Sequence, residues 1–148
     1  MMTPKQAKEW LNRNYRDFER LNADIRFRDK LAERVNQCIG QYESDGSESH
    51  DPERSKAHHE DMLLEYSEQK RKVEDETIKL NAEDRKTRQA IAELRNSDYE
   101  AVATDRYINR LKWEDIFKLE HRSKAQTHRT HGKMLEAMAK ILTEGGYV

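Results

Sequence analysis

The side chains with the clearest chemistry lie between Arg122 and Lys133, a segment that contains four bases and no carboxylate. Arginine and lysine donate hydrogen bonds to phosphate oxygens and to guanine, and glutamine can pair with adenine through two hydrogen bonds. The whole chain carries 28 bases against 29 acids, so this positive charge is local. The segment is therefore a candidate surface for a nucleic acid. Its candidate contact residues are Arg122, Ser123, Lys124, Gln126, His128, Arg129 and Lys133.

These residues belong to predicted helices joined by a tight turn. A capping box at 97–100 begins the unit, and a short helix then opens at Trp113. The turn is expected at 121–123. Ser123 and Gln126 form another capping box, which opens the last helix with its backbone N–H groups available to a phosphate. Two short helices followed by a basic third are typical of a helix-turn-helix.

The last helix is predicted to have an inward and an outward face, and Gly145 and Gly146 are expected to end it. Gly132 costs about 1 kcal/mol relative to alanine, so another helix or a DNA strand could come close there, or the glycine is simply tolerated. The basic residues lie on or beside the outward face. The inward face contains Thr127, Thr130, Met134, Leu135, Met138 and Ile141.

The N-terminal part has the pattern of long helices. Thr3 to Gln6 reads as a capping box with proline at the first helical position, and a seven-residue apolar repeat continues from there to Tyr42. A second helix is expected from Pro52 to Leu94. The polar linker at about 43–52 cannot span a rod of roughly 60 Å, so the two helices must run antiparallel.

The expected fold is therefore all-α: a long antiparallel helical hairpin, coiled-coil-like, over residues 1–96, and a small helix-turn-helix unit over 97–148. A two-helix hairpin buries only part of each apolar stripe. We therefore expect a homodimer through the N-terminal helices, or packing of the hairpin on the C-terminal unit.

Composition and motifs exclude several other classes of protein. Cys38 is the single cysteine, and no apolar run approaches the roughly 20 residues of a membrane span, so we expect a cytoplasmic protein. His121, His128 and His131 have no cysteine or carboxylate among them, which argues against a metal site. No nucleophile elbow, phosphate loop or catalytic pair is present. We predict a non-enzyme without cofactor or metal.

Four motifs resemble a family of phage and prophage regulators of Gram-positive bacteria, the ArpU-like and RinA-like late-gene activators: 105–108, 113–116, 123–126 and 128–133. The C-terminal unit of that family is similar to region 4 of bacterial sigma factors. The resemblance implies a sequence-specific transcriptional regulator that binds double-stranded DNA and can touch host RNA polymerase.

The resemblance also implies roles for single residues. Ser123 would hold a phosphate, and Arg122 and Lys133 would be phosphate contacts that fix the register on DNA. The residues that would face base edges are Lys124, Gln126, His128 and Arg129.

The sequence departs from the family pattern at Lys112, where a capping Ser or Thr is usual, at Asp105, and at Thr127 and Thr130, where aliphatic residues are usual. These departures motivate a second hypothesis: a phage-encoded inhibitor that binds a host machine such as RNA polymerase or a CRISPR effector. A third hypothesis, a DNA-packaging terminase small subunit, shares the long helices and DNA binding.

Overall fold

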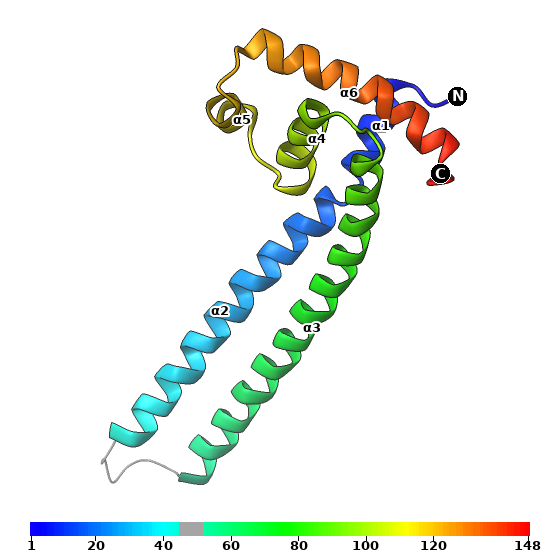
Figure 1. Ribbon diagram of the computed structural model, residues 1–148. Helices are drawn as coiled ribbons and strands as arrows, with labels where there is room; N and C mark the ends of the chain where they lie inside the picture. The colour runs from blue at the N-terminus through cyan, green and yellow to red at the C-terminus, as the bar shows by residue number, and fades with distance from the viewer. Residues whose placement is uncertain (45–51) are drawn as a thin grey trace. The chain divides into compact units, whose positions relative to one another are not determined.

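All regular structure in the described part of the chain is helical, as predicted. The computed structural model describes residues 1–44 and 52–148, apart from the side chains at 39–44, 52 and 55. Most of the predicted linker at 43–52 therefore lies outside the described residues. The elements are α1 (Pro4–Leu11), α2 (Tyr15–Ser44), α3 (Pro52–Ala92), α4 (Ser97–Ala103), the π-helical turn η1 (Thr104–Ile108), α5 (Trp113–Glu120) and α6 (Lys124–Glu144) (Figure 1).

The described helices form two compact units. The hairpin unit is Arg16–Leu80, and the terminal unit joins Met1–Tyr15 to Asn81–Val148. The sequence prediction had divided the chain at residue 96 instead. The grouping differs because α1 packs against α6, which places the first residues of the chain with the last ones. None of the described helices is long and apolar enough to cross a membrane.

In the hairpin unit, α2 and α3 run antiparallel (Figure 1). Leu21, Val73 and Leu80 are buried between the helices, with Phe18 and Ile25 packed against them. The predicted heptad positions of both helices therefore face each other. The middle of the seam is polar, as its sequence indicated. There, the buried Gln69 side chain donates a hydrogen bond of 2.9 Å to the backbone oxygen of Asp24.

The first helix is broken, where the sequence pattern had predicted one continuous helix from Pro4. Residues 12–14 separate α1 from α2. The guanidinium of Arg13 donates 3.0 Å hydrogen bonds to the Trp10 carbonyl and to Thr87 Oγ1, and the buried Asn14 donates one of 3.4 Å to Asp84. The hydrogen bonds to Thr87 and Asp84 join the break to α3, in place of the backbone hydrogen bonds that a continuous helix would have made.

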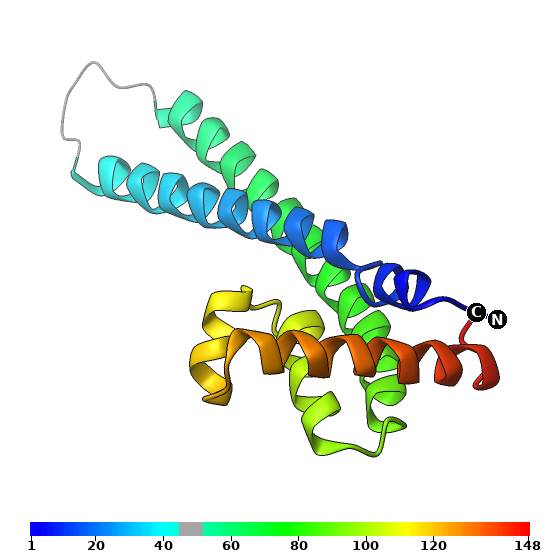
Figure 2. The ribbon, with the colours of Figure 1, turned by 90° about the horizontal axis from the view of Figure 1, so that it is seen from above.

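The terminal unit has its own apolar core, to which α1, the end of α3, α4, η1 and α6 contribute. In Figure 2, α6 lies across α4 and alongside α1. The largest share of the core comes from α6, because five of its residues at helical spacing face inward. The buried core residues are Ala7, Leu11, Ala90, Ile91, Ala103, Tyr107, Met134, Leu135, Met138, Ala139 and Leu142.

Capping residues set most of the helix boundaries. The capping box between Thr3 and Gln6 is present as predicted, and Gly145 is the C-cap of α6. The prediction at Ser97 was one residue late. The N-cap of α4 is Asn96, whose side chain accepts hydrogen bonds from the backbone N–H of Asp98 and Tyr99. Asparagine and serine cap about equally well, so the pattern alone did not separate these neighbours.

Candidate nucleic-acid interface

A tight left-handed turn joins α5 to α6. His121 has φ 52° and ψ 34°, and it reverses the chain after Glu120. Ser123 then caps α6: its Oγ accepts a 3.2 Å hydrogen bond from the Gln126 backbone, and the Gln126 side chain accepts one of 3.3 Å from the Ser123 backbone. The predicted turn and capping box are both confirmed. Lys112 provides no side-chain cap for α5, as its type indicated.

A cluster of aromatic and histidine rings holds α5 against α6. The rings of Trp113 and Phe117 are stacked at 6.2 Å between centroids. His128 lies 5.1 Å from Trp113 and 5.4 Å from Phe117, and His131 meets Trp113 edge-on at 4.7 Å. The Arg106 guanidinium lies 4.8 Å from the centre of the Trp113 ring, a cation–π contact. These contacts fix the angle at which α6 leaves the turn.

Behind this cluster, a buried hydrogen bond of 2.7 Å joins Tyr107 Oη to His131 Nε2. Burial raises the pKa of Tyr107 to about 12. Burial, together with the charges of Lys8, His128 and Arg106, lowers the pKa of His131 to about 4. His131 is therefore a neutral core residue near pH 7. Its bond to Tyr107 occupies Nε2, and the described residues contain no group of three potential metal ligands.

The loop before α5 is fixed to α3 by an ion pair. Arg110 adopts a left-handed backbone conformation, with φ 56°. It donates hydrogen bonds of 2.9 Å and 3.2 Å to the two carboxylate oxygens of Asp84. The two side chains are only 9% and 14% exposed. This pair could not be predicted from the sequence, since one acid and one base among many give no signal of burial.

The structure separates five of the predicted DNA-contact residues, the four base-reading residues and the phosphate contact Lys133, into two groups. Gln126, Arg129 and Lys133 are exposed and follow one another at spacings of three and four, so they share one face of α6. Lys124 and His128 are exposed as well, but their side chains also contact α5: Lys124 Nζ lies 5.8 Å and the His128 ring 5.4 Å from the centre of the Phe117 ring. Among the described residues, Arg129 and Lys133 have no ion-pair partner.

A shallow polar hollow of about 240 Å³ lies at the start of this face. Arg122, Gln126, Arg129 and Thr130 line it. The Thr130 hydroxyl donates to the Gln126 carbonyl within its own helix. Thr127 Oγ1 is buried, and no described residue bonds to it.

Gly132 lies beside this face with open space around it. A Cβ at this position would meet no atom within 4 Å, so no helix of the described chain packs there. The glycine, together with the exposed Ala125 one heptad before it, leaves the backbone of α6 accessible between the longer polar side chains. Packing against another helix of the described chain is therefore not the reason for this glycine.

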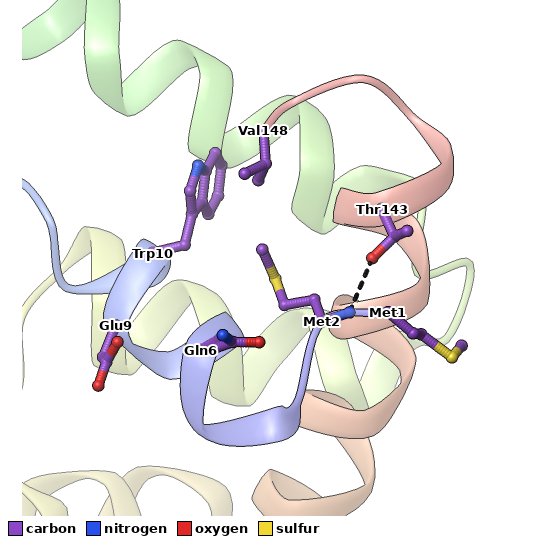
Figure 3. Close-up of a pocket in the computed structure, with 7 residues that line it drawn as sticks. All are labelled: Met1, Met2, Gln6, Glu9, Trp10, Thr143 and Val148. Carbon is purple, nitrogen blue, oxygen red and sulfur yellow. Dashed lines mark hydrogen bonds between the residues drawn. The ribbon is translucent and has the colours of Figure 1, made fainter.

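A second hollow, of about 550 Å³, lies at the other end of α6. Trp10 and Val148 form part of its wall, and the backbone N–H of Met2 donates a 3.3 Å hydrogen bond to Thr143 Oγ1 beneath it (Figure 3). Glu9 is the single carboxylate that lines it. Gln6 and Thr143 add uncharged polar side chains to its lining.

No protein-family model, no characterised protein and no solved structure is detectably similar to this chain. The family suggested by the four C-terminal motifs therefore stays a prediction from those residues.

Proposed function

We propose that this protein is a phage-type, sequence-specific transcriptional regulator, late-gene activator-like, that binds double-stranded DNA through α6. The observation that carries the proposal is the exposed face formed by Gln126, Arg129 and Lys133, directly after a capped helix-turn-helix turn. A recognition helix reads DNA through such side chains in its N-terminal turns.

The side chains of this face suit different tasks on DNA. Arg129 can donate two hydrogen bonds to guanine, and Gln126 can pair with adenine once its contact with the Ser123 backbone is released. Lys133, one turn further along, suits a phosphate. Lys124 and His128 are exposed and also contact the aromatic rings of α5, so they help to hold α6 in place as well as facing DNA.

The proposal extends to the assembly. A homodimer through the N-terminal helices would present two recognition helices, and its DNA half-sites would be separated by whole helical turns. Host RNA polymerase is a second partner of a late-gene activator, and the host cytoplasm is where both partners are found.

Selection from a random duplex library tests the proposal. We expect an enriched motif whose binding is weakened in Arg129→Ala and is unchanged in Arg88→Ala, which removes an exposed arginine of α3. Binding that is weak, blind to sequence and lost with moderate salt would count against a sequence-specific regulator.

A protein-interaction inhibitor is the second candidate, and exposed apolar residues on α3 favour it. Leu64 and Ile78 are 59% and 68% exposed. They are two heptads apart, so they lie on one face of the helix. Affinity capture from host lysate with wild-type protein and with the Leu64→Lys/Ile78→Lys variant tests this function. A single host protein captured by the wild type alone, without DNA binding, would favour the inhibitor.

A further inference from the structure

Arg122 in the turn between α5 and α6 is held by Asp98 in the first turn of α4. The guanidinium of Arg122 donates a hydrogen bond to Oδ1 of Asp98, within an ion pair. The two side chains are 33% and 57% exposed, so an external ligand can reach both. The contact with Asp98 also raises the pKa of Arg122.

A second carboxylate adds to the field around Arg122. Glu120, the last residue of α5, interacts electrostatically with Arg122. Burial raises the pKa of Glu120, and the charges of Asp105 and Asp98 raise it as well. Arg122 is thus surrounded by acids from α4 and α5, while it also lines the polar hollow beside Arg129.

Arg129 and Lys133 face solvent without such a partner among the described residues. Arg122 therefore differs from the other cations of the proposed interface: its charge is already compensated. An exposed ion pair of this kind is weak. A phosphate can replace the carboxylate, because both anions match the planar donor fork of arginine.

We propose that Asp98 and a DNA phosphate compete for Arg122, so that Asp98 limits the affinity of the protein for DNA. The inference rests on the proposed function. In the free protein Arg122 is bound to α4, and on DNA it would move to the phosphate backbone. Asp98 is then a positioning residue that acts through Arg122, without touching DNA itself.

A double-mutant cycle tests the competition. The probe is a mixed-sequence duplex of about two helical turns at low salt, and the proteins are wild type, Asp98→Asn, Arg122→Ala and the double variant. In the wild-type background, Arg122→Ala should change Kd by less than about twofold. In the Asp98→Asn background, it should weaken binding by about fivefold to tenfold, and freeing Arg122 should raise the slope of log Kd against log salt by about 0.9.

Asp115→Asn is the matched control, because it removes an exposed carboxylate in the first turn of α5, as Asp98 lies in the first turn of α4. If Asp98→Asn and Asp115→Asn strengthen binding equally, the gain comes from net charge and the competition is wrong. The same conclusion follows if Arg122→Ala has the same effect in both backgrounds. Circular dichroism on each variant confirms that the helices are intact. If wild type and all variants fail to bind the duplex, the proposed function fails together with the inference.

Discussion

Tyr107 and His131 are joined by a buried hydrogen bond of 2.7 Å that connects the π-helical turn η1 to the middle of α6. Their rings are also nearly parallel, with centroids 5.9 Å apart. The side chain of His131 touches Trp113 of α5 as well. His131 therefore links α6, the proposed recognition helix, to both η1 and α5.

Tyr107→Phe should destabilise the terminal unit by about 1 to 3 kcal/mol, since it leaves a buried histidine nitrogen without its partner. Urea unfolding followed by circular dichroism measures the change. Tyr99→Phe is the matched control, because Tyr99 is half-buried in the same unit and its hydroxyl has no hydrogen bond to a described residue. Equal stability of the two variants would show that the Tyr107–His131 bond contributes little.

The stability of the protein should also depend on pH through His131. Its pKa is lowered to about 4 in the folded state from an ordinary 6.5, so the unfolded chain binds the proton more readily. The contribution of neutral His131 is complete above pH 6.5 and is lost as the pH falls toward 4. Between pH 7.5 and pH 5, this one group should cost about 2 kcal/mol.

His131→Gln isolates that contribution, because the variant removes this titration and keeps the other acidic and basic groups. The free energy of unfolding of wild type should fall more steeply between pH 7 and pH 5 than that of His131→Gln. His58→Gln, which removes an exposed imidazole, should follow the wild-type curve. If the free energy of unfolding fell equally with pH in wild type and in His131→Gln, His131 would not take up a proton on unfolding.

Arg110→Ala should be the most destabilising of the single substitutions considered, at about 3 to 5 kcal/mol, because it removes the ion-pair partner of the largely buried Asp84 carboxylate and leaves it the 3.4 Å hydrogen bond from Asn14. The double variant Arg110→Ala/Asp84→Ala should lose less than the sum of the two single variants. Thermal unfolding of the four proteins gives the coupling energy. An additive result would show that the ion pair is not formed in solution.

The features that could be predicted from sequence are those with local chemistry. Capping boxes such as Ser123 with Gln126, and apolar repeats such as that of Val73 and Leu80, depend on residues within one or two helical turns. They therefore predicted the helices, the antiparallel hairpin and the turn before α6.

The features that were missed depend on contacts between residues far apart in sequence. The break at 12–14 exists because Arg13 binds groups on α3, more than seventy residues away. The left-handed conformations of Arg110 and His121 had no glycine or asparagine to signal them. The outward residues of α6 were mostly identified, but the packing of Lys124 and His128 on α5 required the geometry of the aromatic cluster.

Arg129→Ala should weaken binding to a selected DNA site by roughly 1 to 3 kcal/mol and relax the preference at one base pair, if Arg129 reads a guanine. Lys133→Ala should instead weaken binding to all sequences about equally and lower the salt slope by about 0.9, since a phosphate contact carries no sequence information. Titration of the selected duplex and of its single-base variants separates the two effects. Arg129→Ala that lowers affinity uniformly, without any change in base preference, would assign Arg129 to the phosphate backbone and leave Gln126 as the base-reading residue of this face.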